Sequence, residues 1–304
     1  MVSETDTPTS LDDVRGWFIG HDQLAFEWIL DAQSKAGMSG DLLELGVYEG
    51  KSAIHMARFL RPGEALTVCD LFEDVSVADG VPEYIRSAYS SLSQAIFERN
   101  FLAFHEQLPV IIRARTDTID DHVRAGSCRF AHVDASHSYD DVRHDIGAVR
   151  RLLGPGGVVA FDDYRTEHTL GTAAAVWEAV ATEELHPIAA TSHKMYATWS
   201  DPAPLQEAMM RKLRRRSDLR AAMVPLRDGH VIRLAQWKME QRPTVAGPQT
   251  VRPSAPMRAL ERIGLTLNDI GYRAVRLSHH RDPLASIRRS VGLRVDSARQ
   301  RIDR

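Results

Sequence analysis

The amino-acid sequence predicts an α/β fold with a seven-stranded sheet, which is mostly parallel with an antiparallel last strand and has helices on both faces. Two patterns lead to this prediction. Short apolar segments alternate with helix-like segments over residues 41–185, the order that gives a parallel sheet covered by crossover helices. The segment HPIAATSHKMYATW (186–199) then holds two strand-like runs, and their connection of two or three residues permits only an antiparallel pair.

Five predicted parallel strands precede that pair. They are DLLELGV (41–47), LTVCDLF (66–72), PVIIRAR (109–115), RFAHVDA (129–135) and VVAFDDY (158–164). We expect helices over residues 51–60, roughly 82–108, 138–153 and 169–185. The helix over 138–153 has the clearest signal, because its apolar residues recur at spacings of three and four and Ser138 with Asp141 resembles a capping box. Right-handed crossovers place the carboxyl ends of these strands at one edge, where ligands bind.

The composition is that of a soluble globular protein. The chain has 304 residues, of which 43% are hydrophobic and 26% are charged. It has no run of about 18 apolar residues that could span a membrane, and its polar, acidic first residues do not resemble a signal peptide. Its two cysteines, Cys69 and Cys128, lack the CxxC spacing, so we expect reduced thiols and a cytoplasmic protein.

Charge and composition divide the chain into four predicted parts: an N-terminal helical segment (1–40), the α/β domain (41–200), a helix and hairpin extension (201–240), and a Pro-rich linker with a basic tail (241–304). Residues 205–304 carry 22 Lys and Arg against 9 Asp and Glu. The favoured interpretation of the tail is a flexible or self-packing segment. A sharper alternative is docking to an anionic membrane surface or an acidic partner. Nucleic acid is not expected, since Tyr272 is the one aromatic residue after residue 257.

The first strand leads into a glycine loop, ELGVYEGKS (44–52). Gly46 and Gly50 are separated by three residues, and Tyr48 occupies the place where nucleotide-binding loops often have a glycine. A plain strand-to-helix turn explains this loop nearly as well as a binding site does. Asp70, at the end of the second strand, favours the binding site, because its distance in sequence from Gly46 is near that of the acid that contacts ribose hydroxyls.

Acidic residues end the fourth and fifth strands. Asp134 is followed three residues later by His137, and the fifth strand ends in Asp162 and Asp163. Each residue alone has an ordinary explanation, such as a helix cap, a solvated histidine or an ion pair with Arg165. Together, three carboxylates at adjacent strand ends would repel one another without a cation. The pattern therefore predicts a metal site, and aspartate oxygens favour Mg²⁺.

The segments GDLLELGVYEGKSA, VCDLF, HVDASHSYDDVRHDI and LLGPGGVVAFDDY resemble the Rossmann-like class I S-adenosylmethionine-dependent methyltransferases. They look most like the group that contains the macrocin-type and mycinamicin-type sugar O-methyltransferases, and the resemblance covers roughly residues 15–199. It implies that Asp134, Asp162 and Asp163 hold Mg²⁺ and that His137 is the base. The residues implied to bind S-adenosylmethionine are Glu44, Gly46, Tyr48, Gly50, Ser52, Asp70, Thr116 and Asp117.

The resemblance implies an O-methyltransferase whose acceptor is a hydroxylated small molecule, such as a glycoside or glycolipid, and we also expect a homo-oligomer. Two alternatives stay open. The acids could hold a metal for another reaction, such as hydroxylation, although a redox iron site usually takes two histidines and the pattern places one. The chain could also be a non-catalytic protein that keeps the cofactor fold for binding, against which the complete set of acids and His137 argues.

Overall fold

A computed structural model describes residues 7–76 and 92–236. All of these residues belong to one compact unit of the chain, Met1–Lys238. The predicted linker and basic tail (241–304) therefore lie outside the described residues, as does the first part of the helix expected over 82–108. No helix in the described ranges has both the length and the apolar character needed to cross a bilayer.

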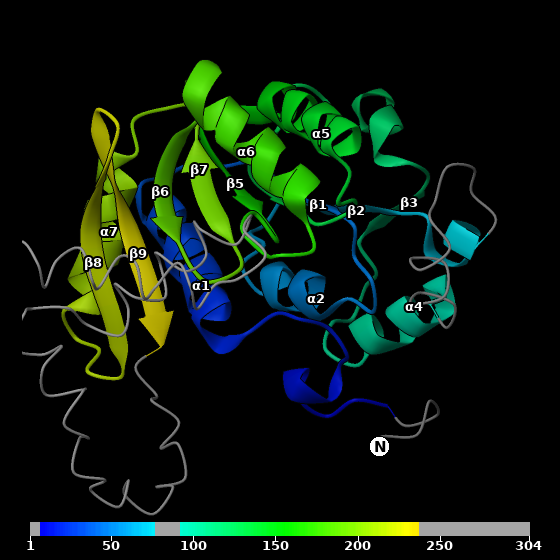
Figure 1. The fold of residues 1–304 in the computed structure, drawn as a ribbon. Coiled ribbons are helices and arrows are strands. Elements are labelled where there is room, and N and C mark those ends of the chain that lie inside the picture. Colours follow the sequence, from blue (N-terminus) through cyan, green and yellow to red (C-terminus); the bar gives the residue numbers. More distant parts are fainter. Residues whose placement is uncertain (1–6, 77–91, 237–304) are drawn as a thin grey trace, which may run out of the picture. The chain divides into compact units, whose positions relative to one another are not determined.

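The described residues form one mixed sheet of nine strands in the order β3-β2-β1-β4-β5-β7-β6-β9-β8 (Figure 1). The central part is parallel, and β7 is antiparallel to both of its neighbours, β5 and β6, as the short connection predicts. The strands are β1 (Asp41–Leu45), β2 (Leu66–Asp70), β3 (Val110–Arg113), β4 (Cys128–Val133), β5 (Leu153–Phe161), β6 (His186–Ala190), β7 (Met195–Thr198), β8 (Leu219–Leu226) and β9 (Gly229–Gln236).

The prediction of seven strands was wrong, because the hairpin after residue 218 extends the sheet. Strand β9 pairs in parallel with β6, and β8 pairs antiparallel with β9. Helix α7 (Ala203–Leu213) lies in the connection between β6 and the hairpin, which is long enough for a parallel pair. Helix α7 of this extension ends at Leu213. Strand β8 begins at Leu219, and its side chains alternate between half-buried and exposed except at Ala221 and Ala222, which are both half-buried.

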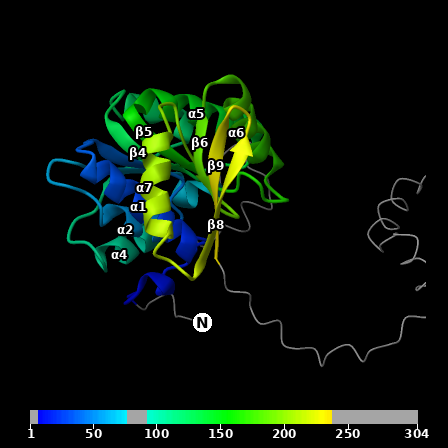
Figure 2. The same cartoon turned by 90° about the vertical axis from the view of Figure 1, so that its left-hand side faces the viewer.

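Helices cover both faces of the sheet, with their packing visible in Figures 1 and 2. One face packs against α1 (Gly20–Lys35), α2 (Lys51–Ala57), α4 (Gln94–Leu102) and α7. The other face packs against α5 (Tyr139–Leu152) and α6 (Leu170–Thr182). Three short 3₁₀ helices complete the described elements: η1 (Leu11–Asp13), η2 (Phe72–Ser76) and η3 (Thr116–Asp121).

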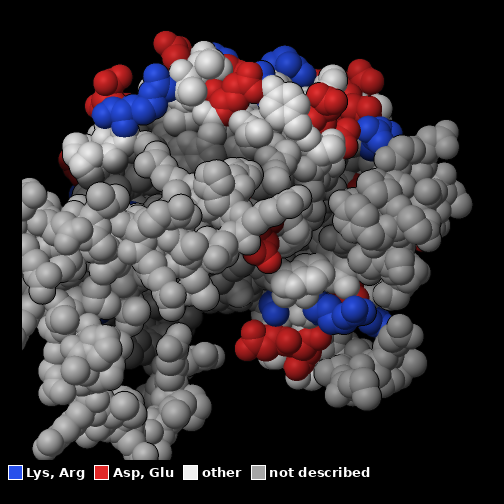
Figure 3. All heavy atoms as spheres, viewed as in Figure 1, with Lys and Arg blue, Asp and Glu red and all other residues white. Residues whose placement is uncertain are grey.

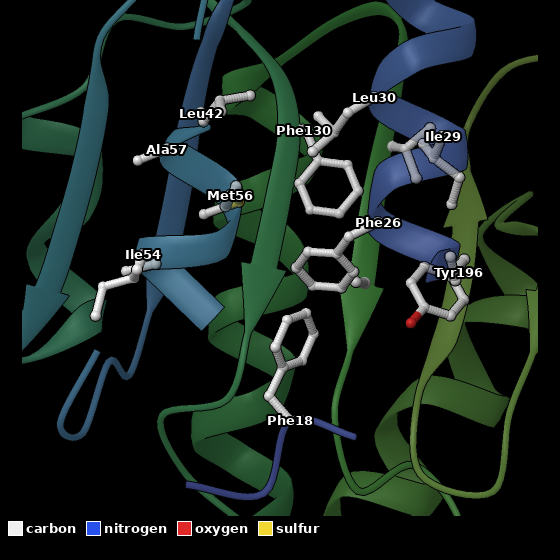
Figure 4. Close-up of a cluster of buried hydrophobic side chains, with 14 of the residues drawn as sticks. Phe18, Phe26, Ile29, Leu30, Leu42, Ile54, Met56, Ala57, Phe130 and Tyr196 are labelled. Atoms are coloured by element: carbon white, nitrogen blue, oxygen red, sulfur yellow. The ribbon is translucent and has the colours of Figure 1, made fainter. Parts of the chain in front are cut away.

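The core on the α1 side contains an aromatic cluster that runs from the N-terminal segment to the sheet (Figure 4). The Phe26 ring centroid lies 4.9 Å from those of Phe18 and Phe130 and 5.9 Å from that of Tyr196, in edge-on geometries. Aromatic pairs at these separations add to the stabilisation from burial. The cluster therefore fixes residues 14–26 against the sheet, close to the carboxyl ends of its central strands.

The outer face of α5 and α6 carries charged side chains, and Figure 3 shows acidic and basic groups interspersed with other residues over this region. Ion pairs between Arg143 and Glu183 and between Arg151 and Asp120 lie there. Partly exposed pairs of this kind contribute little to stability. The two free cysteines, Cys69 and Cys128, are buried within the core on the inner side of these helices.

Candidate active site at the carboxyl edge of the sheet

Three strand ends meet at the edge where the sequence places its candidate residues. The hydrogen-bond ladder continues one residue beyond the ends of β4 and β5. The Asp134 amide donates to the Leu45 carbonyl (2.7 Å), and the Asp162 amide donates to the Val133 carbonyl (3.0 Å). Gly46, Asp134 and Asp162 thus stand side by side after β1, β4 and β5. A Cβ atom on Gly46 would lie 2.3 Å from the Asp134 carbonyl oxygen, so the glycine loop touches the end of β4.

The glycine loop has a left-handed backbone at three positions. Gly46 has φ of +80°, Tyr48 of +49° and Gly50 of +95°, and Gly50 caps the start of α2. A Cβ atom on Gly50 would lie 2.8 Å from the Phe97 ring, so the loop also packs closely on α4. Its backbone amides and the start of α2 form the kind of turn that favours a carboxylate or phosphate group. Trp17, which is 72% exposed, lies against Tyr48 with a centroid distance of 5.5 Å.

Asp70 supports this loop from the end of β2. Its Oδ2 accepts hydrogen bonds from the amides of Val47 (2.6 Å) and Tyr48 (3.1 Å), and its Oδ1 accepts one from the Phe72 amide (2.7 Å). Desolvation is the largest influence on this carboxyl group and raises its pKa, although the three amide donors oppose the shift. Both oxygens are therefore engaged with the backbone, and a ribose at this position would share them with the loop.

Thr116 and Asp117 lie further along the same edge. They begin η3, which is separated by two residues from the end of β3, and β3 pairs with β2 so that Asp70 stands opposite Arg113. The exposed Asp117 carboxylate accepts a hydrogen bond from Arg115 at 3.2 Å. The structure thus brings these two residues to the edge that holds Gly46 and Asp70. They follow β3, which is separated by β2 from β1 and its glycine loop.

The carboxyl groups of Asp134 and Asp162 form the acidic centre of the edge. Together with His132 they offer ligand atoms that all lie within 4.8 Å of one another. Desolvation and the adjacent Asp162 charge raise the pKa of Asp134. Burial works against the Asp162 carboxylate as well, but the neighbouring Lys194 ammonium outweighs it and lowers the pKa of Asp162.

The side chain of Asp163 points away from the acidic centre, unlike that of the preceding Asp162. Its φ of +52° turns the chain out of β5, and its Oδ2 lies 3.3 Å from Nε2 of His137. The His137 ring lies edge-on to that of His168, with 6.0 Å between centroids. The structure therefore brings Asp134 and Asp162 together and places Asp163 with His137, outside the group of three potential ligands.

A buried polar chain connects the glycine loop to the acidic centre. Ser52 donates to Oε1 of Glu44, which also contacts His132 Nδ1 at 2.7 Å. His132 Nε2 in turn lies 3.0 Å from Lys194 Nζ, and this ammonium pairs with Asp162 Oδ2. Glu44 and Ser52 were expected at the site from the sequence, whereas His132 and Lys194 were not among the predicted site residues. The signal that was missed is a polar residue inside each of two adjacent apolar strands, since Glu44 and His132 stand opposite each other in register.

These residues fit the groups that the sequence implies. Asp134 is an exposed residue whose carboxylate lies beside that of Asp162, and carboxylate oxygens are the ligands that Mg²⁺ prefers. The fit is limited on the inner side, since Asp162 already accepts hydrogen bonds from Lys194 and from the Asp163 amide. For the methyl donor, Glu44 Oε2 is fully buried and has no hydrogen-bond partner among the described residues, so it can accept from a donor group in the loop.

A family model described as a methyltransferase domain matches residues 43–164. The match begins within β1 and ends after Asp163, so every candidate residue from Glu44 to Asp163 falls inside it. The chain is thus an enzyme of the methyltransferase type, and its candidate active site is the edge described above. No curated protein matches the chain significantly.

Several solved structures resemble this methyltransferase. The O-methyltransferase NovP is 18% identical, with 59% of this chain and 81% of that chain covered and a TM-score of 0.45. A TDP-rhamnose 3'-O-methyltransferase of calicheamicin biosynthesis is 17% identical, with 65% and 90% covered and a TM-score of 0.40. An O-methyltransferase from Bacillus cereus in complex with SAH is 15% identical, with 65% and 94% covered and a TM-score of 0.42. Likenesses at this level carry no argument about the chemistry of this chain.

Proposed function

We propose that the chain is an S-adenosylmethionine- and Mg²⁺-dependent O-methyltransferase that acts on a hydroxyl group of a sugar, a glycosylated small molecule or a glycolipid. The observation that carries this proposal is that Asp134 and Asp162 meet beside the glycine loop, at the ligand-binding edge of a methyltransferase domain. A site for a methyl donor and a site that can activate a hydroxyl group would then be neighbours.

The glycine loop is proposed to bind the donor. S-adenosylmethionine, when bound, supplies a methyl group that is already activated for displacement, so the protein mainly orients the reactants. The amides around Gly46 and Gly50 suit the carboxylate end of the donor, and Glu44 Oε2 suits a donor group such as its ammonium. Asp70 fixes the loop in the required conformation through its hydrogen bonds to Val47 and Tyr48.

The acidic centre is proposed to hold the metal through Asp134 and Asp162. Mg²⁺ held by these two carboxylates would lower the pKa of a neighbouring hydroxyl group, as metal ions do for water. We propose a different role for Asp163, since its carboxylate contacts His137. Its expected role as a third ligand remains a prediction. The group of His132, Asp134 and Asp162 has one histidine, whereas a redox iron site usually takes two, so hydroxylation is not favoured.

His137 is proposed as the general base. Its Nε2 faces Asp163 Oδ2 at 3.3 Å, so an N–H on that nitrogen donates to the carboxylate and leaves Nδ1 to accept the hydroxyl proton. Asp163 then stabilises the imidazolium that results and holds the ring in one orientation, as the acid does in other histidine–carboxylate pairs. The left-handed turn at Asp163 serves this contact, because it directs the side chain away from Asp162.

A methyl-transfer assay tests the proposal. The full chain is incubated with S-adenosylmethionine labelled in the methyl group, Mg²⁺ and a panel of free sugars, nucleotide sugars, glycosylated small molecules and glycolipids. We expect label on an acceptor oxygen, loss of transfer with a chelator, and recovery when excess Mg²⁺ is added. Transfer that persists in the chelator would remove the metal from the reaction, and calorimetric binding of NAD but not S-adenosylmethionine would overturn the assignment of the donor.

The basic tail (241–304) and the oligomeric state stay proposals of their own. For the tail, we propose contact with an anionic membrane surface or an acidic partner as the alternative to a self-packing segment. A chain that ends near residue 240 should bind anionic liposomes less than the full chain if this contact exists, and equally if it does not. Sedimentation of the full chain tests the expected homo-oligomer.

A further inference from the structure

We propose that Lys194 is a built-in counter-cation of the Asp134–Asp162 carboxylate pair, so that a divalent cation at this site competes with a fixed ammonium group. The inference that Lys194 neutralises the pair stands on the contacts of Lys194 alone. Its consequence for the metal rests on the proposed function, in which these carboxylates hold Mg²⁺. Lys194 would then act as a positioning residue, because it holds Asp162 in place from the inner side of the site.

The backbone of Lys194 is fixed by a tight turn between β6 and β7. Thr191 Oγ1 accepts a hydrogen bond from the Lys194 amide (2.8 Å), and the Lys194 carbonyl accepts one from the Thr191 amide (2.9 Å). Tyr164, in the chain that leaves β5, donates its hydroxyl to the Thr191 carbonyl (3.3 Å) and its amide to the His193 carbonyl (3.3 Å). The turn that carries Lys194 is therefore tied to the segment that carries Asp162.

The side chain of Lys194 is enclosed, with 1% of its surface exposed. Its Nζ pairs with Asp162 Oδ2 and lies 3.0 Å from His132 Nε2 and 5.8 Å from the centre of the Phe18 ring. Glu44 holds the other ring nitrogen of His132 at 2.7 Å, so His132 Nε2 can face the ammonium only as an acceptor. Because each neighbour is itself held, the position of the ammonium group is set by the fold.

Acids still outnumber this cation in the buried region. Asp22 is fully buried, accepts the Tyr196 hydroxyl at 2.8 Å, and has a second oxygen with no hydrogen-bond partner among the described residues. Its charge acts on Lys194 together with those of Asp162 and Asp134. A single ammonium group therefore leaves the region acidic, and a second cation on the exposed side of Asp134 is compatible with it.

Without the Lys194 ammonium group, the repulsion between the Asp134 and Asp162 carboxylates should destabilise the protein. In Lys194→Met, the methionine fills a similar volume without a charge, so Asp162 keeps its buried carboxylate but loses its partner. Breaking one half of a buried ion pair is strongly destabilising, and we expect the melting temperature to fall by roughly 10 °C. A divalent cation can replace the lost positive charge, so Mg²⁺ should raise the melting temperature of K194M more than that of the wild type.

The experiment measures thermal unfolding of the full chain with MgCl₂ and with NaCl at matched ionic strength. The variants are K194M, D162N, the double variant D162N/K194M, and K35M as a control at a lysine whose side chain is 72% exposed. We expect the Mg²⁺-specific shift to be larger in K194M than in the wild type and unchanged in K35M. We also expect D162N/K194M to be clearly more stable than K194M, because the unpaired charge is then gone.

Two results would overturn the inference. The first is a Mg²⁺-specific shift in melting temperature that is equal in K194M and the wild type, or absent from both. The second is a fall in melting temperature on Lys194→Met that is as large in the D162N background as in the wild type. If K194M does not fold, D162N/K194M decides, since it must fold if the role of Lys194 is to neutralise Asp162. These outcomes are separate from the proposed function, which fails if the wild type transfers no methyl group from S-adenosylmethionine to any hydroxylated acceptor.

Discussion

Gly46 at the end of β1 lies against the backbone of Asp134 at the end of β4. A Cβ atom on Gly46 would stand 2.3 Å from the Asp134 carbonyl oxygen and 2.5 Å from the Ala135 Cα atom. This contact brings the proposed donor loop and the acidic centre into one rigid unit, because both neighbours of Gly46 are backbone atoms that cannot rotate away. It explains why the two predicted sites occupy the same place in the structure.

Gly46→Ala should therefore destabilise the protein well beyond the effect of backbone strain. The left-handed φ of +80° alone disfavours alanine by about 1 kcal/mol, and the clash with Asp134 should add roughly 2–4 kcal/mol. Gly63→Ala is the matched control, since Gly63 has φ of +85° and a Cβ atom there would have no neighbour within 4 Å. Urea denaturation measures both. Equal losses for the two variants would contradict the close contact at Gly46.

Asp145→Asn should stabilise the protein at neutral and higher pH. Asp145 lies on α5, is fully buried, and neither carboxylate oxygen has a hydrogen-bond partner among the described residues. Desolvation raises its pKa to about 7. The stability that protonated Asp145 provides is therefore complete below about pH 4 and is lost as the pH rises to about 7.

The neutral amide of D145N avoids this loss. We expect a gain of up to ~4 kcal/mol in unfolding free energy at pH 8 and little gain at pH 4, measured by urea denaturation at both pH values. Asp121→Asn serves as the control, because Asp121 is exposed at the end of η3. Its effect on unfolding free energy should show no comparable difference between the two pH values. A gain in D145N that does not depend on pH would mean that the carboxyl group is not the cause.

Glu64→Gln should weaken the end of the sheet opposite the site. Arg129 is 1% exposed and forms two hydrogen bonds to Glu64, at 3.1 and 3.0 Å. Desolvation works against the Glu64 carboxylate, but Arg61 and Arg129 outweigh it and lower its pKa to about 2. Because E64Q leaves the Arg129 charge buried without a counter-ion, we expect a loss of about 3 kcal/mol at pH 7.

The pH dependence of E64Q provides a second check. A lowered acid pKa gives stability that is present above about pH 4.5 and is lost as the pH falls towards 2, so the difference between wild type and E64Q should shrink over that range. Glu106→Gln, at an exposed position, should change unfolding by well under 1 kcal/mol at either pH. A constant difference across the range would argue that shape rather than charge matters at Glu64.

His137→Gln should reduce turnover without affecting binding of the methyl donor. Loss of a general base lowers kcat by about 10²–10⁴-fold, whereas the glycine loop that is proposed to bind the donor is unchanged. His168→Gln is the control. The His168 ring lies 6.0 Å from that of His137, and His168 has no proposed role in proton transfer. Steady-state kinetics and calorimetry with S-adenosylmethionine measure the two effects. Similar kcat values for H137Q and H168Q would remove His137 from the reaction.

Asp163→Asn separates the two roles considered for Asp163. If this residue orients His137, D163N should lower kcat while the Mg²⁺ concentration needed for half-maximal activity stays the same, because Asp134 and Asp162 are intact. If it is a metal ligand, that concentration should rise markedly. Titration of activity with MgCl₂ in the variant and the wild type distinguishes the two results.

The pattern of residues along the chain is enough to predict which segments form the central strands and where their polar ends lie. The apolar runs ending in Gly46, Asp134 and Asp162 alternate with helices, and parallel strands joined by crossovers must present these ends at one edge. The short connection before Met195 likewise required an antiparallel pair, which the structure has in β6 and β7. These features follow from local pattern and from the reach of the chain, so they are readable without knowing which residues touch.

The pairing of neighbouring groups depends on the tertiary structure. Glu44 and His132 are far apart in sequence and meet because β1 and β4 align in register, and Lys194 reaches His132 only because β7 packs beside β5. The addition of β8 and β9 to the sheet depends in the same way on the free edge of β6. Local sequence encodes the period and ends of each element, whereas the partner of a buried charge is set by the register and packing of distant segments, which make contact only once the sheet is assembled.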